Sequence, residues 1–197
     1  FVIPGLNVLV MAILSILLTA LTVAREYENG SMELLLTTPV RPLEIIVGKL
    51  MPYFVLGILA IGFIFLIARL VFDVPFVGNP FTFGLGSFLF LIAYLAQGLV
   101  ISVVTRSQMV AMQMAMVSGM LPTTLLSGFV FPIESMPNFF RVLTMVFPAR
   151  WFMNISRDSF LKGTSFFDLW PSFLGLTLFC IFMIGVSTRR FKRDLEP

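Results

Sequence analysis

Histidine is absent from this chain, and charged residues make up only 12% of its 197 positions. Without histidine the chain cannot contain a Ser–His pair, a His-ligated zinc ion or a histidine proton relay, so we expect no catalytic site and no metal site of these kinds. The shortage of charge excludes a water-facing surface as well, because such a surface carries charge on roughly a quarter to a third of its positions.

Cysteine and nucleotide-binding signals are also scarce. The one cysteine, Cys180, cannot form a disulfide within the chain. A phosphate-binding P-loop needs the pattern Gly-x-x-x-x-Gly-Lys-Ser/Thr. The only Gly-Lys pair, Gly48-Lys49, is followed by Leu50 and has Leu43 at the first glycine position. We therefore predict that this chain binds no cofactor and does not hydrolyse ATP by itself.

Hydrophobic residues dominate what is present, at 58% of the chain with a mean hydropathy of +1.02. A hydrocarbon core of about 30 Å needs roughly 20 apolar residues in a helix. Each apolar run is continuous and lacks the alternation of barrel strands. The sequence therefore predicts an all-α integral membrane protein with five spans, at about residues 1–24, 43–72, 81–104, 109–131 and 169–188.

Basic residues near the span ends predict the orientation, because Lys and Arg are retained on the cytoplasmic side. When the five spans alternate, the basic C-terminal cluster from Arg189 to Arg193 falls on one side together with four other cations: Arg25, Arg41, Lys49 and Arg106. We expect this side, and the C-terminus, to be cytoplasmic. The basic tail also explains the net charge of +3, and it suits anionic lipid headgroups. No basic face interleaved with aromatics indicates a nucleic-acid partner.

The stretch from Arg25 to Pro39 places charges between two apolar spans. Glu26 and Glu33 lie about two helical turns apart, and Met32, Leu35 and Leu36 can form an apolar stripe. This pattern is typical of a helix at a membrane interface or of one that docks on another protein. The alternative is an ordinary solvated loop. We expect a short amphipathic helix over about residues 25–39.

The connection from Pro132 to Asp168 is aromatic but too interrupted to cross a membrane. Pro137 and Pro148 divide it, so we expect two short helices on or in the outer leaflet over about residues 132–165. The span before it places Ala111, Ala115 and Gly119 on one face, which favours tight helix packing. A path for apolar cargo is the other possibility, and its candidate residues are Gln97, Met112, Gln113 and Met116.

Two motifs resemble those of type-2 ABC exporter permeases, the membrane subunits of ATP-driven exporters. The first is Arg25-Glu-Tyr-Glu-Asn-Gly-Ser-Met-Glu-Leu-Leu-Leu-Thr-Thr-Pro39, continuing through Gly48-Lys49 to Pro52. The second is Gly128-Phe-Val-Phe-Pro132-Ile-Glu134-Ser-Met-Pro137, followed by Pro148 and by Arg157 to Gly163. The resemblance covers essentially the whole chain. It implies a six-span permease whose first span and external domain precede Phe1 and are missing here.

In that family the loop after the second span forms a coupling helix in a cleft of a nucleotide-binding subunit. The resemblance therefore implies an ATPase contact made by Arg25, Glu26, Glu28, Asn29, Gly30, Glu33, Leu34, Leu35 and Leu36. It also implies an outer re-entrant hairpin that contains Gly128, Phe131, Pro132, Glu134, Pro137 and Pro148. Charge reversal at Glu26 and Glu33 is then expected to uncouple ATP hydrolysis from transport.

The expected function is outward transport of a hydrophobic or amphipathic substrate, drug-like or lipid-like, in a bacterial inner membrane. The resemblance implies a homodimer or heterodimer of permeases, with ATP and Mg²⁺ held by the separate ATPase subunit. An ion-coupled secondary transporter is the first alternative, but it would be expected to carry buried carboxylates near the bilayer midplane, and no predicted span has one at its centre. A noncatalytic membrane scaffold is the second alternative.

Overall fold

The protein forms an elongated helical bundle in a computed structural model that describes residues 2–30, 42–73, 76–164 and 166–195. No strand occurs in these ranges. Five helical segments are long and apolar enough to cross a membrane: Val2–Glu28, Glu44–Leu70, Pro80–Thr105, Gln108–Leu126 and Trp170–Arg190. The predicted all-α membrane fold with five spans is confirmed.

Four of the spans are continuous helices, and one is composite. The continuous ones are α1 (Val2–Glu28), α3 (Pro42–Leu70), α4 (Pro80–Thr105) and α9 (Trp170–Leu195). The composite span, here called the α5–α6 span, joins α5 (Gln108–Ala115), a π-helix η1 (Met116–Met120) and α6 (Leu121–Leu126). A π-helix in mid-span marks a local change of helical register.

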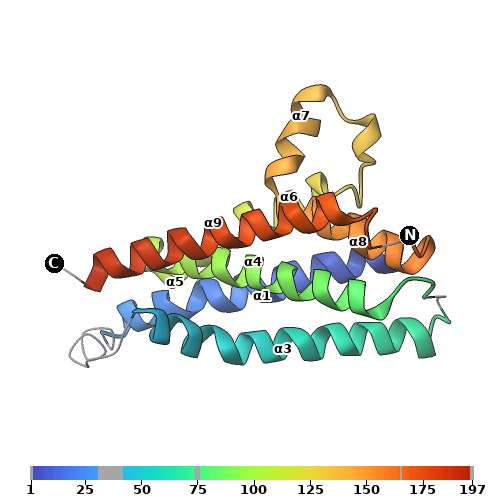
Figure 1. Cartoon of the computed structure of the whole chain (residues 1–197). Helices are drawn as coiled ribbons and strands as arrows, with labels where there is room; N and C mark the ends of the chain where they lie inside the picture. Colours follow the sequence, from blue (N-terminus) through green and yellow to red (C-terminus); the bar gives the residue numbers. More distant parts are fainter. Residues whose placement is uncertain (1, 31–41, 74–75, 165, 196–197) are drawn as a thin grey trace.

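Helix α4 lies at the centre of the bundle and packs against α1, α3, α5, α8 and α9 (Figure 1). Its approach to α1 is close because Gly98 has no side chain: a Cβ there would lie 2.7 Å from the carbonyl oxygen of Ile16. One turn further, the Ser102 hydroxyl accepts hydrogen bonds from the backbone amides of Val23 and Ala24, at 2.9 and 2.8 Å. Small residues thus bring the two backbones together, as is usual for helices in membranes.

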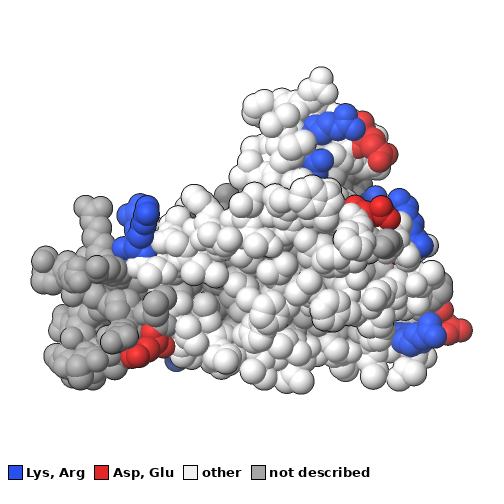
Figure 2. All heavy atoms as spheres, in the orientation of Figure 1, with Lys and Arg blue, Asp and Glu red and all other residues white. Residues whose placement is uncertain are grey.

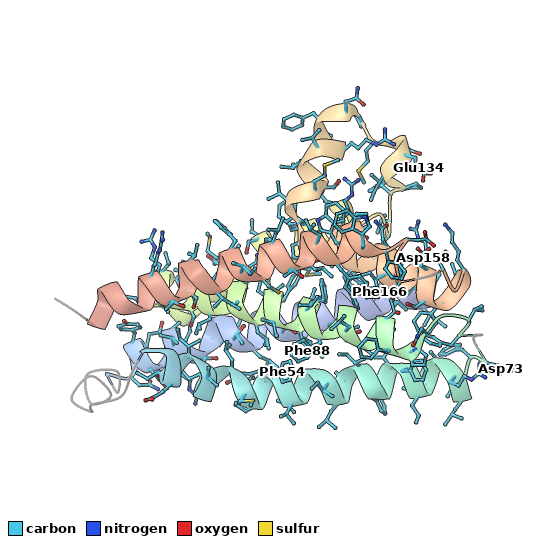
Figure 3. The ribbon with its side chains drawn as sticks, in the orientation of Figure 1. Phe54, Asp73, Phe88, Glu134, Asp158 and Phe166 are labelled. Atoms are coloured by element: carbon cyan, nitrogen blue, oxygen red, sulfur yellow. The ribbon has the colours of Figure 1, made fainter. Side chains whose placement is uncertain are left out.

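Aromatic side chains fill the space beside α4. The ring of Phe90 stacks on Phe152 with centroids 4.3 Å apart and lies 4.6 Å from the ring of Tyr94. Helix α3 flanks this core, and Phe54 of α3 meets Phe88 of α4 edge to face at 5.2 Å (Figure 3). The rest of α3 is largely exposed on the outside of the bundle.

The connection after α6 contains four short elements: η2 (Ile133–Ser135), α7 (Asn138–Leu143), η3 (Thr144–Val146) and α8 (Pro148–Leu161). Helix α8 lies in the bundle, with Phe152, Met153 and Ile155 fully buried. Residues 127–147, here called the arm, project sideways from it and include α7 (Figure 1). The two short helices expected here are therefore α7 and α8, and they differ in burial.

Three segment boundaries differ by more than two residues from those expected. Helix α1 continues to Glu28, so Arg25, Glu26 and Glu28 lie in its last turn instead of in a separate helix. The α5–α6 span ends at Leu126 and not near residue 131, because Gly128 takes a left-handed conformation (φ 86°) that stops the helix. Helix α9 runs beyond residue 188 to Leu195.

Candidate functional site at the basic end of the bundle

Charged side chains on the face drawn in Figure 2 gather at the two ends of the bundle and on the arm, and an uncharged belt separates them. One end, here called the basic end, is where α1 and α9 finish and where α3 and α5 begin. Its cations include Arg25, Lys49, Arg106, Arg189 and Arg190. The predicted ATPase-contact residues that the structure describes lie at this end.

The last turn of α1 finishes at a glycine. The amide of Asn29 donates to the carbonyl of Arg25 at 3.0 Å, and Gly30 follows with φ 69°. A glycine in this conformation is a common helix stop because it lacks the Cβ that would clash. Arg25, Glu28, Asn29 and Gly30 are exposed. The other predicted contact residues, Glu33, Leu34, Leu35 and Leu36, lie outside the described residues.

Glu26 joins α1 to α3. Its carboxylate forms an ion pair with the ammonium group of Lys49, whose side chain is only 12% exposed. A partly buried pair is screened less by salt than an exposed one. Removing either partner leaves the other charge poorly solvated, so the pair ties the two helices together.

Glu28 joins α1 to the start of α5. Its carboxylate accepts hydrogen bonds from the Ser107 hydroxyl at 3.0 Å, the Gln108 backbone amide at 2.8 Å and the Gln108 side-chain amide at 2.6 Å. Ser107 occupies the N-cap position of α5 without capping that helix itself. The carboxylate of Glu28 therefore takes the place of the N-cap side chain, where a negative charge is favourable.

Tyr27 joins α1 to the turn between α4 and α5. The guanidinium carbon of Arg106 lies 5.0 Å from the centroid of the Tyr27 ring, within the range of a cation–π contact. Arg106 also closes α4, with φ 53° and its amide bonded to the Ser102 carbonyl at 3.3 Å. A left-handed backbone conformation at a residue other than glycine raises the free energy of the folded state by about 1 kcal/mol or more, which such local contacts can offset. Three successive residues of α1 thus hold three neighbouring elements.

The four candidate path residues do not lie together. Met112, Gln113 and Met116 are exposed on the outer face of the α5–α6 span. Gln97 is instead buried on α4, and its side-chain amide donates to the carbonyl of Ser118 in the π-helix at 3.2 Å. Gln97 thus makes an interhelical hydrogen bond, which is the usual role of an amide side chain between membrane helices.

Two arginines of α8 hold the two ends of the arm. Arg157 donates to the carbonyl of Gly128 at 3.0 Å, and Arg150 donates to the carbonyl of Arg141 at 2.8 Å and to the Thr144 hydroxyl at 2.6 Å. Burial, followed by the nearby positive charge of Arg141, lowers the pKa of Arg150. The other predicted hairpin residues divide into two groups. Pro148 begins α8 and is buried, and the exposed ones are Phe131, Pro132, Glu134 and Pro137.

The chain matches a known protein family over most of its length. The family model described as ABC-2 family transporter protein matches residues 1–189. This chain belongs to that family. The resemblance to ABC exporter permeases is thereby confirmed at the level of the family, and the chain is a multi-pass membrane protein.

Several bacterial members of the ABC-2 family are similar along most of this chain. In Escherichia coli (strain K12), the "Probable multidrug ABC transporter permease YbhS" is 38% identical over 196 residues, which is 100% of this chain and 52% of YbhS. The similarly named YbhR is 30% identical over 195 residues, 99% of this chain and 53% of YbhR. The "Linearmycin resistance permease protein LnrN" of Bacillus subtilis (strain 168) is 28% identical over 164 residues, 80% of this chain and 42% of LnrN. The chain therefore spans about half the length of YbhS and YbhR.

Sequence reasoning missed the groups that Glu26, Tyr27 and Glu28 bind within this ABC-2 chain. The partners are distant from α1 in sequence: Lys49, Arg106, Ser107 and Gln108. The predicted topology put them on the same side of the membrane as the end of α1, but it did not predict the contacts. A further signal was present but weak: Ser107 has the residue type of an N-cap directly before α5.

Proposed function

We propose that this chain is the membrane-spanning part of an ABC exporter permease. A separate nucleotide-binding subunit, which holds ATP and Mg²⁺, supplies the energy. The chain works with a second permease copy, identical or related, in a bacterial inner membrane. It moves a hydrophobic or amphipathic substrate, drug-like or lipid-like, toward the outside. The family match over residues 1–189 carries this proposal.

The names of the relatives support the substrate class. Two are named multidrug permeases and a third a linearmycin resistance permease. The exposed face of the α5–α6 span suits such cargo, because Met112 and Met116 offer flexible, polarizable side chains beside the amide of Gln113. Bilayer lipid covers this face when no cargo or second copy does. Exchange of both methionines for leucine is expected to alter the substrate profile.

Charge distribution supports an orientation with the basic end in the cytoplasm. Arg25 in the last turn of α1, and Arg189 and Arg190 near the end of α9, lie at that end. The ATPase subunit would then meet Arg25 and Asn29, which are exposed, together with the segment that follows Gly30. Glu26 would affect this contact indirectly, through its effect on α3, because its carboxylate forms an ion pair with Lys49 of that helix.

Copurification and vesicle transport test the proposal. The full-length permease, expressed with a candidate ATP-binding-cassette ATPase of the same organism, is expected to copurify with that ATPase and to move a fluorescent amphipathic dye in an ATP-dependent manner. The control replaces the P-loop lysine of the ATPase, which positions the nucleotide phosphates. Absence of a bound ATPase, or transport that is equal with the control, would contradict the proposal.

A charge swap separates two roles of Glu26. Glu26→Lys breaks the pair with Lys49 and places two cations together, so transport per ATP is expected to fall by about tenfold, as for a coupling of 1–3 kcal/mol. Adding Lys49→Glu restores an ion pair between α1 and α3. Recovery in the double variant assigns Glu26 to the bundle, whereas a persistent defect assigns it to the ATPase contact.

A further inference from the structure

Glu28 and Glu26 lie two residues apart on α1 and serve different helices. Successive residues of an α-helix are separated by about 100° around its axis, so the two residues lie about 160° apart, on nearly opposite sides of the helix. Glu26 binds Lys49 of α3, and Glu28 binds Ser107 and Gln108 at the start of α5. A motion at the end of α1 can therefore pass to the bundle by two separate connections, one to α3 and one to α5.

Among the described residues, α5 packs against α1 and α4, and hydrogen bonds from other elements reach the α5–α6 span at its start and again from the π-helix onward. At its start, the three hydrogen bonds to Glu28 include the backbone amide of Gln108. In the π-helix the Ser118 carbonyl accepts from the Gln97 side chain, and in α6 the Thr123 hydroxyl bonds to the Tyr94 hydroxyl at 2.6 Å. Between these points lie α5 and the beginning of the π-helix.

The π-helix separates the two halves of this span, α5 and α6. Its wider turn breaks the regular i to i−4 ladder, and side chains of α4 bind the carbonyl of Ser118 and the Thr123 hydroxyl. Thr123 in turn donates to the carbonyl of Gly119 at 2.7 Å. Side chains of α4 thus hydrogen-bond to the π-helix and to α6, whereas the start of α5, a helix that itself packs against α1 and α4, is hydrogen-bonded to the end of α1.

We infer that Glu28 is a positioning residue that passes movement from the segment after α1 to α5. Displacement of α1's end by an ATPase subunit would pull the first turn of α5 through a carboxylate bonded to its backbone and side chain. The exposed face of α5 would shift relative to α6 about the π-helix. This inference rests on the proposed function and adds a named link within it.

Three variants in the full-length permease with its ATPase test the link. Glu28→Ala removes all three acceptor bonds, and Asp73→Asn changes an exposed carboxylate in the loop between α3 and α4. Glu28→Gln keeps a carbonyl oxygen that can accept from the Ser107 hydroxyl and the Gln108 backbone amide. Transport per ATP hydrolysed is expected to fall about five- to tenfold in Glu28→Ala. Glu28→Gln is expected to retain most of it, and Asp73→Asn all of it.

Hydrogen exchange supplies a readout that loss of stability alone would not mimic. Exchange of the peptide covering residues 104–115 is measured with and without a nonhydrolysable ATP analogue. The nucleotide is expected to change this exchange in the parent and in Glu28→Gln but not in Glu28→Ala. If Glu28→Ala does not purify as a folded complex, the double variant Ser107→Ala/Gln108→Leu removes two of the three donors from the other side, and the same loss is expected.

The outcomes separate the two proposals. A parent that binds no ATPase and shows no ATP-dependent transport overturns the proposed function, and the link with it. A parent that transports normally, together with a Glu28→Ala variant (or, where that variant does not purify, a Ser107/Gln108 variant) that retains both coupling and the nucleotide effect on exchange, overturns the link alone.

Discussion

Helices α3 and α4 are both long, apolar and able to span a membrane, yet they occupy opposite places in the bundle. Of the most apolar 18-residue stretch of each helix, 61% is buried in α4 and only 6% in α3. Hydropathy does not separate them, because lipid tails are as apolar as a protein core. Close packing separates them, and it depends on where small and aromatic side chains face.

Phenylalanine truncation is expected to give the largest difference between the two helices. Phe90 of α4 is fully buried and stacks on Phe152, so Phe90→Ala removes that stacking and leaves a cavity. We expect a loss of about 3 kcal/mol in the free energy of unfolding, the lower end for such a change in water, because lipid solvates the unfolded side chain.

Phe63 of α3 provides the matched control, since its side chain is 64% exposed. Phe63→Ala is expected to cost under about 1 kcal/mol. Unfolding of both variants in lipid nanodiscs measures the difference. Equal losses in the two variants would show that α3 is as well packed as α4 and would contradict the comparison.

Glycine substitution gives the next largest effect. In Gly98→Ala the new Cβ would meet the Thr19 hydroxyl and the Ile16 carbonyl of α1, so the helices must separate. We expect a loss of about 1–3 kcal/mol, typical of overpacking, and a lower midpoint of thermal unfolding. At Gly62 of α3 a Cβ would meet nothing within 4 Å. Gly62→Ala is therefore expected to be neutral or slightly stabilising, and a destabilised Gly62→Ala variant would speak against the open position of α3.

Loss of the Ser102 hydroxyl gives the smallest effect. Ser102→Ala removes the acceptor for the amides of Val23 and Ala24, and we expect a loss of about 0.6–1.7 kcal/mol, the range of interhelical hydrogen bonds in membranes. The control is Thr105→Val, because the Thr105 hydroxyl bonds only to the Ile101 carbonyl of its own helix in the described structure. Thermal unfolding of the two variants is compared, and a larger loss at Thr105 would contradict the interhelical role of Ser102.

The candidate site was predicted in part. The sequence placed Arg25, Glu26 and Glu28 at one end of the bundle, and they lie at an end in the structure, since an apolar chain places ionisable groups outside the hydrocarbon. Their hydrogen-bond partners could not be predicted, because Glu28 and Gln108 are 80 residues apart and no local pattern relates them. The proposed ATPase contact and substrate path stay predictions.

The sequence alone determined that this protein is helical and has five segments, all found in the described residues, that are long and apolar enough to cross a membrane. Each apolar run is long enough to span the hydrocarbon core. In lipid, such a run can satisfy its backbone hydrogen bonds by itself only as a helix, and this requirement is local. The tertiary structure alone decided that α4 is central, that α3 faces outward and that the end of α1 holds α3 and α5. These features depend on which side chains meet across helices, and hydropathy carries no information about such meetings where protein and lipid are equally apolar.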